Sequence, residues 1–432
     1  MNEKLEFRGY WFLPGKYDSK VAGILTFVPN KKIKLELIGS FDNDSEPLHA
    51  FLNKKTEMIL HGITSDSKEI TLYNCYPSGK VNLSCPFPMV NYTCQYLLVG
   101  KFLDNINECS FNKIQVHFPI LNEWLYPGLI ETKIEFNQDK QKCFSYSVSN
   151  EKIEEPKCKI KINENLDLII RSGISVNESD LRLDVELSQS TFFEIESDKE
   201  KITLKKLLEK SGVFEQFISL AALSTNRVTN IILFDNDSYQ ELTDGTRIKD
   251  SIDFFYVDRT PFYSERKSNH DFLFTYSQVE AIFPQIISKW YNDSDNIAPI
   301  RGHLIESVRE KSQYSSLDFL IIVQALEGFH RRYIDHKKVS LKKRLSELKS
   351  KFDDITKVKN VDIDLDAAVD SRDYYSHFFK RTEKPHLLDG IELYNLSKKL
   401  RLLLICCVLN LIGIENETIN VLLNHSNSDK LI

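Results

Sequence analysis

The sequence predicts an α+β chain, in which a mainly antiparallel, sandwich-like β region precedes an all-α helical bundle. Up to about residue 258, short runs of alternating apolar and polar residues are separated by clusters of Asn, Asp, Ser, Gly and Pro, which is typical of antiparallel strands. After residue 271 the apolar residues recur at helical spacing instead. The charged stretch 259–271 between the two parts has no apolar period and is predicted to be a hinge.

The strand pattern is clearest in residues 33–39, where Ile33, Leu35 and Leu37 alternate with polar residues. Residues 181–188 alternate in the same way. Further strands are predicted at 21–29, 68–75, 92–100, 112–118, 166–172, 190–197, 230–236 and 252–258. Residues 204–223 break the pattern, because their apolar residues share one face of a helix. We expect this helix to pack on a sheet.

Helices dominate the second half of the chain. They are predicted at about 275–292, 300–312, 316–335, 340–354, 365–381 and 389–412. Short connections between amphipathic helices imply a bundle. The last helix is apolar almost all round, which places it in the bundle centre or at a subunit contact. We therefore expect two domains, residues 1–265 and residues 266–432.

The composition is that of a globular protein, with 42% apolar and 27% charged residues among 432. The charged start of the chain does not resemble a signal peptide, and the longest apolar run, 402–409, is far shorter than a bilayer span. We expect a cytoplasmic protein with no membrane partner. The sequence has no glycine-rich phosphate loop and no GxSxG motif, so it gives no support for an ATPase or a hydrolase of those types.

Eight cysteines without a regular framework indicate free thiols in a reducing compartment. Cys75, Cys85, Cys94 and Cys109 are separated by 10, 9 and 15 residues and contain no CxxC pair. Zinc modules normally supply such close pairs, because neighbouring thiolates must converge on one ion. Buried sheet cysteines are the default interpretation, and a zinc site stays an alternative.

Residues 330–344 are strongly basic, with seven Lys or Arg against one Asp. Such a stretch could dock phosphates, although from charge alone a solvated helix face is the better interpretation. An arginine and a histidine five positions apart occur three times in the bundle region. The pairs are Arg331 with His336, Arg372 with His377, and Arg381 with His386. The spacing is weak evidence by itself, so the context of each pair has to decide.

The pair Arg372 and His377 has the best context, because it lies in a helical stretch without Gly or Pro. Pro385 precedes His386 and disfavours a fixed helical geometry there. In a helix, Asp373 and His377 share a face, so the carboxylate could orient the imidazole. Arg372 lies about 140° away around the helix axis and would reach the same phosphate only through its long side chain.

Residues 319–333, 341–352 and 371–379, together with the final apolar helix, resemble an ApeA-like HEPN domain. The hallmark of that domain is an arginine, a polar residue and a histidine in one helix, matched here by Arg372, Asp373 and His377. Residues 5–39, 61–75 and 117–125 are similar to the ApeA N-terminal domain. The two resemblances follow the order of the family and cover nearly the whole chain.

The resemblance implies a metal-independent endoribonuclease of bacterial anti-phage defence that acts by abortive infection and needs no cofactor. Two HEPN bundles would pair as a homodimer and share a cleft. His377 would serve as general acid or base, and Arg372 would hold the scissile phosphate. The 2′-hydroxyl of RNA would attack, leaving a 2′,3′-cyclic phosphate and a 5′-hydroxyl, so DNA should survive. The family often has Asn where this chain has Asp373, whose charge would repel the phosphate unless His377 or Arg372 neutralises it.

We expect RNA to be the partner, with a tRNA or another structured RNA as the family-style substrate. The candidate RNA-binding residues are Arg331, Arg332, Lys337, Lys338, Tyr374, Lys380 and Arg381. The N-terminal domain would sense a phage-derived trigger and restrain the nuclease. Two alternatives stay open: a catalytically inactive RNA-binding or dimerisation module coupled to a ligand-sensing β domain, and a metal-dependent nuclease. Assembly beyond a dimer is also open.

Overall fold

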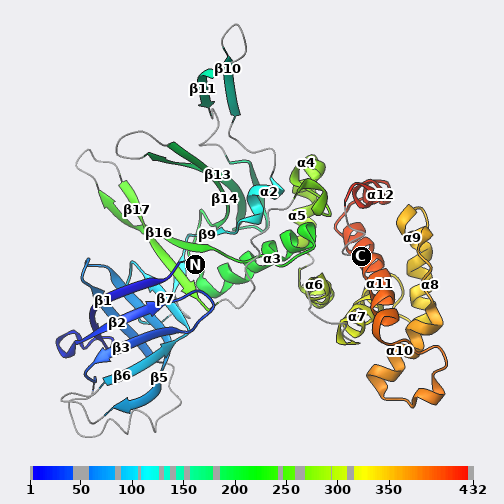
Figure 1. Cartoon of the computed structure of the whole chain (residues 1–432), viewed down its shortest axis with the longest axis horizontal. Coiled ribbons are helices and arrows are strands. Elements are labelled where there is room, and N and C mark those ends of the chain that lie inside the picture. Colours follow the sequence, from blue (N-terminus) through cyan, green and yellow to red (C-terminus); the bar gives the residue numbers. More distant parts are fainter. Residues whose placement is uncertain are drawn as a thin grey trace.

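The computed structural model describes residues 3–41, 58–82, 89–105, 109–125, 131–136, 143–149, 156–178, 185–241, 247–257, 268–292, 294–308 and 316–426. A β-rich region comes first, and helices follow (Figure 1). The predicted fold class, antiparallel β structure followed by a helical bundle, is confirmed.

The first strands close into an antiparallel barrel, in the order β5-β4-β1-β2-β3-β6 and back to β5. Buried side chains, among them Trp11, Phe27 and Leu35, fill its interior. In β3 buried and exposed residues alternate without exception, as the sequence predicts. The barrel strands are β1 (Leu5–Phe12), β2 (Val21–Phe27), β3 (Ile33–Ile38), β4 (Met58–Thr64), β5 (Glu69–Asn82) and β6 (Met89–Cys94).

Strand β5 joins the barrel to the other strands of the same 13-stranded sheet. Up to Tyr73 it pairs with β7 (Tyr96–Val99), and from Tyr76 onward it pairs with β6. Between the two, Asn74 has a left-handed backbone with φ 54°, a conformation that asparagine tolerates better than most residues. The segment predicted as one strand at 92–100 is accordingly divided at Gln95 into β6 and β7.

Beyond β7 the strands do not close into a barrel but continue as an open sheet that ends at β12. Helix α3 (Leu204–Ala222) packs on β9 and β14 of this open sheet. The helix predicted at 204–223 is therefore confirmed, and so is its packing on a sheet. Its N-terminus is capped by Thr203, whose side chain accepts a hydrogen bond from the Lys206 amide. The open sheet continues as β17 (Arg247–Tyr256), β16 (Asn230–Glu241), β9 (Lys113–His117), β14 (Val185–Glu196), β13 (Asp167–Glu178) and β12 (Cys158–Lys161).

Short elements complete the β-rich region. Strand β8 (Ser110–Phe111) pairs with β15 (Ile202–Thr203), and β10 (Glu131–Phe136) pairs with β11 (Cys143–Ser149). Helix α2 (Ile120–Trp124) contacts β14 and α3.

Helix α11 lies at the centre of the helical part, as its sequence predicts. Its side chains from Leu400 to Leu409 are buried, and it contacts α6, α7, α8 and α12. The short helices α9 and α12 were not predicted. The helices are α4 (Tyr276–Val279), α5 (Phe283–Asn292), α6 (Ser294–Val308), α7 (Ser316–Tyr333), α8 (Leu341–Lys351), α9 (Thr356–Asn360), α10 (Leu365–His377), α11 (Gly390–Leu411) and α12 (Asn416–His425).

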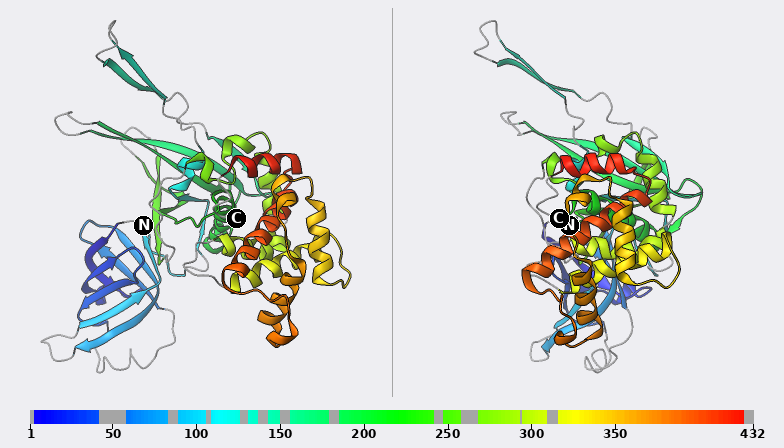
Figure 2. Two further views of the ribbon diagram at one scale, coloured as in Figure 1. Left: turned by 45° about the vertical axis from the view of Figure 1, so that its right-hand side comes forward. Right: turned by 90° about the vertical axis from the view of Figure 1, so that its right-hand side faces the viewer.

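One cluster of buried side chains runs from the open sheet through α3 into the helices, and a separate cluster fills the barrel. Figure 2 shows α3 between the sheet and the helices. Polar contacts fix this junction: the Trp290 indole donates to the Val213 carbonyl at 2.8 Å, and Arg301 Nε donates to Gln216 Oε1 at 2.6 Å. The boundary expected at 265/266 lies between residues 258 and 267, outside the described residues, and stays a prediction.

The described thiols do not gather around a common metal site. Cys75 and Cys94 lie side by side in the barrel core, where burial raises the pKa of Cys75, whereas Cys109 borders the other core cluster. Cys85 lies outside the described residues. In the described part of the chain, no group of three or more His, Cys, Asp or Glu side chains could hold a metal ion. None of the described helices is both long and apolar enough to cross a membrane.

Candidate active site

Helix α10 carries the candidate catalytic residues in its last two turns. Asp364 caps its N-terminus by accepting a hydrogen bond from the Ala367 amide at 2.9 Å. Ala367, Ala368 and Ser371 are buried and form the face that packs on the bundle. The helix ends at His377 because Phe378 turns left-handed with φ 57°, so the helix predicted to reach residue 381 stops earlier.

Arg372 and His377 are in direct contact. Arg372 NH1 donates to His377 Nε2 at 2.8 Å, so the long arginine side chain does reach a residue five positions further along the helix. A guanidinium can only donate, and this assigns Nε2 as the acceptor and places the ring proton of the neutral histidine on Nδ1. The imidazole is exposed, whereas the Arg372 side chain is only 25% exposed. The pair therefore places the His377 imidazole, which can accept a proton, next to the positively charged Arg372 guanidinium at the protein surface.

Asp373 does not bond to His377, although the four-residue spacing places both on one face. Its carboxylate accepts from Lys384 Nζ at 2.6 Å and lies 3.3 Å from Arg372 NH1. Lys384 also lies 3.5 Å from Asp370. The hydrogen bond to Asp373 raises the pKa of Lys384, which therefore stays charged near neutral pH. The negative charge beside the candidate site is thus neutralised mainly by a lysine.

Side chains of α10 hold the loop that supplies this lysine, residues 378–389. The His386 amide donates to Asp370 at 3.0 Å, and the Leu388 amide donates to Ser371 Oγ at 3.1 Å. The Tyr375 hydroxyl donates to the Leu388 carbonyl at 3.3 Å. The position of Lys384 beside Asp373 cannot be predicted from the sequence, because no spacing rule brings a residue eleven positions later back onto the helix.

The basic stretch, residues 330–344, covers the end of α7, the loop 334–340 and the start of α8. A buried arginine supports this loop. Arg344 donates to the Lys337 carbonyl at 2.8 Å and to His330 Nδ1 at 2.8 Å. His330 in turn bonds through Nε2 to Glu347 at 2.6 Å. The candidate RNA-binding residues of this stretch, Arg331, Arg332, Lys337 and Lys338, are all exposed.

The structure does not bring this basic loop to the Arg372 and His377 pair within one chain. Lys342, just after the loop, binds Asp366 at 2.6 Å near the start of α10. His377 ends the same helix, about 16 Å further along its axis at 1.5 Å per residue. The basic loop and the histidine therefore lie toward opposite ends of α10.

The other candidate RNA-binding residues lie close to His377. Lys380 and Arg381 are exposed in the loop that follows it, and Arg381 forms an ion pair with Asp389 at 2.9 Å. Tyr374 is half-buried, with its ring packed edge-on against Tyr375 at 5.0 Å. Tyr374 therefore presents only part of its ring to a ligand.

Two aromatic residues next to the pair were not among the candidates predicted from the sequence. Phe378 is 86% exposed and Phe379 is 45% exposed. The Phe379 ring lies edge-on to His377 at 6.4 Å, and Lys384 Nζ lies 4.8 Å from the centre of the same ring. The signal that could have revealed them is a pair of phenylalanines just after a helix that ends in polar residues.

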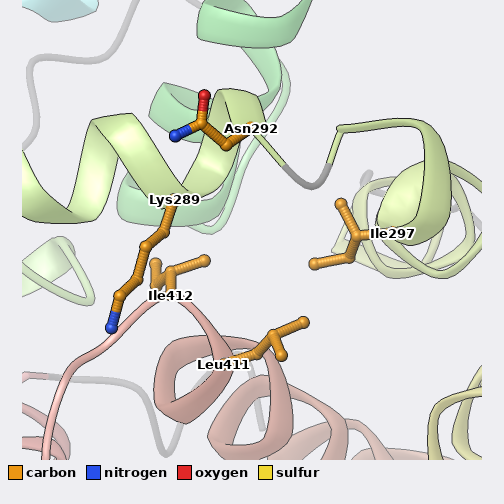
Figure 3. A pocket seen from close by; sticks show the side chains of 5 residues that line it. All are labelled: Lys289, Asn292, Ile297, Leu411 and Ile412. Carbon is orange, nitrogen blue, oxygen red and sulfur yellow. The ribbon is translucent and has the colours of Figure 1, made fainter. Parts of the chain in front are cut away.

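A cavity of about 240 Å³ lies elsewhere, between α5, α6 and the end of α11 (Figure 3). Its lining is mostly apolar, with one lysine and one amide, and it shares no residue with the Arg372 and His377 pair. The lining residues are Lys289, Asn292, Ile297, Leu411 and Ile412.

Comparison with protein-family models matches residues 6–290 to ApeA N-terminal domain 1 and residues 320–418 to the Apea-like HEPN domain. The first match alone spans more than half of the chain. This chain belongs to the ApeA family. The resemblance seen in the sequence is thereby confirmed. No curated protein and no solved structure matches the chain.

The Apea-like HEPN match begins within α7 and ends within α12, so it contains the whole of α10. HEPN domains are generally ribonucleases, and they typically act on RNA and dimerise. The family therefore indicates a nuclease-type role in defence for this ApeA chain. The N-terminal match extends to residue 290 and so includes α4 and most of α5, and α5 packs on α3 through Phe283 and Trp290.

Proposed function

We propose that this ApeA-family chain is a metal-independent endoribonuclease of bacterial anti-phage defence, acting in the cytoplasm by abortive infection. One observation carries the proposal: the exposed His377 ring is bonded to Arg372 at the surface end of α10. An acid–base group and a phosphate-binding cation thus stand together where an RNA backbone can reach both.

The chemistry follows from the donor and acceptor roles of the pair. An incoming phosphate replaces His377 as the acceptor for the Arg372 guanidinium and so frees the Nε2 lone pair. Nε2 then takes the proton of the 2′-hydroxyl, whose oxygen attacks phosphorus. The bond from phosphorus to the 5′-oxygen breaks, and that oxygen takes a proton from water or from the second acid–base group that the proposed dimer supplies. Arg372 opposes the negative charge that builds up on the phosphoryl oxygens.

The products are a 2′,3′-cyclic phosphate and a 5′-hydroxyl, and DNA, which lacks the nucleophile, survives. Asp373 stands where many family members have asparagine. Its carboxylate does not repel the substrate, because Lys384 and Arg372 balance its charge.

The active site is proposed to form in a homodimer of HEPN domains. In the described part of one chain, His377 lies on an exposed surface and not in the cavity that borders α11. A second bundle packed near the same end of α10 would turn this surface into a cleft and would add a second acid–base group.

RNA binding is proposed to extend along α10. Lys380 and Arg381 lie beside the pair, and Arg331, Arg332, Lys337 and Lys338 lie toward the other end of the helix. Contacts this far apart fit a folded RNA such as a tRNA better than a dinucleotide. Tyr374 contributes through the part of its ring that Tyr375 leaves uncovered.

The β-rich region, residues 1–265, is proposed to restrain the nuclease until a phage-derived trigger binds. Helix α3 packs on α6, α6 packs on α7, and α7 packs on α10. A change in the sheet therefore has a continuous packed route to the helix that carries His377.

The test incubates the full-length protein, a His377→Ala variant and a matched His386→Ala variant with total RNA in EDTA. His386 is also exposed, but its described contact is through its backbone amide. We expect the wild type and His386→Ala to degrade the RNA and His377→Ala to be at least about 100-fold slower. Equal RNA integrity with the wild type and His377→Ala would instead favour an inactive RNA-binding or dimerisation module. Cleavage lost in EDTA would indicate a metal-dependent nuclease.

A further inference from the structure

Phe378 combines two unfavourable features at one position. Its backbone is left-handed with φ 57°, a conformation that is unfavourable for any residue with a Cβ atom. Its side chain is also 86% exposed. Glycine is the usual residue at this position after a helix, because it adopts the conformation without strain. The chain instead keeps a large apolar ring in water directly after His377.

Leu223 shows what the same backbone conformation looks like when packing compensates for it. It also follows a helix, α3, with φ 47°, but its side chain is only 3% exposed and contributes to the core. Burial of an apolar side chain offsets the strain at Leu223. Phe378 lacks that compensation, and outliers of this kind concentrate at functional sites.

The residues on either side of Phe378 place its ring next to the candidate catalytic pair. His377 precedes it and is bonded to Arg372, and Phe379 follows it with its ring against His377 and Lys384. The backbone of Phe378 is tied to the helix by its amide, which donates to the Tyr374 carbonyl at 3.1 Å. The ring is thus anchored beside the candidate catalytic pair and extends into solvent.

We propose that Phe378 is a stacking platform for an unpaired RNA base next to the scissile phosphate. This inference rests on the proposed nuclease function and adds that the substrate is unpaired at the cleavage point. A base stacked on the ring covers its exposed face and orients the ribose whose 2′-hydroxyl His377 deprotonates. Stacking of this kind tolerates any base, because every base has a flat π face.

Cleavage kinetics give the first test, with the full chain and an RNA oligonucleotide cut at one known position. Phe378→Gly should lower kcat/KM by about fivefold to a hundredfold, the range for losing one stacked base, while Tm stays equal or rises. Phe378→Trp should keep the activity. Val421→Ala, on another exposed apolar residue of the helical part, should change nothing.

An oligonucleotide that is abasic beside the cleavage point distinguishes stacking from other roles of the ring. With this substrate, wild type and Phe378→Gly should be equally slow. The proposal is overturned if Phe378→Gly remains as active as wild type on the normal oligonucleotide. It is also overturned if Phe378→Gly converts a dimer to a monomer in sedimentation, since the ring would then be a subunit contact.

A binding measurement keeps the two proposals separable if the wild type does not cleave RNA. The native tryptophans Trp11, Trp124 and Trp290 are fully buried, so the indole in the double variant His377→Ala, Phe378→Trp is the exposed fluorophore. Single-stranded RNA should quench its fluorescence, and the same strand hybridised to its complement should quench it less. RNA binding without quenching would overturn stacking, whereas quenching without wild-type cleavage would overturn only the nuclease.

Discussion

At the scale of single residues, the charge next to the proposed phosphate site depends on Lys384. Lys384 binds Asp373 at 2.6 Å, and Asp373 lies 3.3 Å from the arginine that is proposed to hold the phosphate. Without the lysine, this carboxylate would compete with the phosphate for Arg372 and repel it. Asp373 is therefore compatible with the proposed catalysis only because Lys384 neutralises its charge.

Lys384→Met should raise KM and lower kcat/KM for RNA cleavage by about tenfold, the effect of one unbalanced charge near a partly exposed site. Adding Asp373→Asn should restore most of the activity, because the unbalanced charge is then removed. Lys384→Arg is the conservative control and should stay close to wild type. If the double variant is as slow as Lys384→Met, the lysine acts by holding the loop and not through the charge of Asp373.

The sequence identifies part of this site and misses the rest for a physical reason. Arg372 and His377 can be singled out because helical geometry relates residues of one helix, and Pro385 weakens the competing pair. Lys384 and Phe378 cannot be found this way. Their positions depend on where α10 ends and on the contacts that fold residues 378–389 back onto it.

At the scale of elements, strand β9 carries a histidine whose protonation opposes folding. The His117 ring packs against Phe192 at 4.8 Å and contacts the Gln115 side chain at 2.7 Å. Burial lowers the pKa of His117 from 6.5 to about 4, and nearby Glu194 only partly counteracts it. The ring is therefore neutral in the folded chain at neutral pH.

Because the folded pKa of His117 is the lower one, its contribution to stability is complete above pH 6.5 and is lost as the pH falls toward 4. The loss amounts to about 3 kcal/mol of unfolding free energy. His117→Gln should remove this part of the acid sensitivity, which urea unfolding at pH 7 and pH 4 can measure. An equal drop in stability for the variant and the wild type would show that His117 does not titrate in this range.

Elements with a regular pattern could be predicted, and those shaped by their surroundings could not. The alternation in β3 and the apolar face of α3 appear directly in the sequence, since each has one buried side. The division at Gln95 was missed, because β6 and β7 form one apolar run whose break depends on the left-handed Asn74 in the partner strand. Helix α12 is only 10 residues long, so its apolar residues repeat over too few turns to identify a helix from the sequence.

At the scale of the whole molecule, the β-rich region and the helices share a core through α3. Removing residues 1–265 would uncover the apolar faces of α5 and α6, so regulation is better tested with point variants of the full chain. Gln216 of α3 is a suitable target, because its side chain accepts a hydrogen bond from the Arg301 guanidinium, which lies over the Trp290 ring.

Gln216→Leu should loosen the contact between α3 and α6 and weaken the restraint on the nuclease. We expect about tenfold fewer colonies from uninfected cells that express the variant, as the loss of one hydrogen bond to a charged group can shift a two-state balance by that factor. Gln285→Leu, on the exposed side of α5, is the matched control. Unchanged colony numbers together with unchanged phage protection would count against regulation through this contact.

The most direct measurement compares two oligonucleotides that differ only by a 2′-deoxy substitution at the cleaved nucleotide. Wild-type protein in EDTA should cut the all-RNA strand, leave a 2′,3′-cyclic phosphate identified by mass spectrometry, and spare the substituted strand. His377→Ala should cut neither. Cleavage of the 2′-deoxy strand, or equal cleavage by His377→Ala, would contradict the account, because it would show that neither the ribose hydroxyl nor the exposed imidazole performs the reaction.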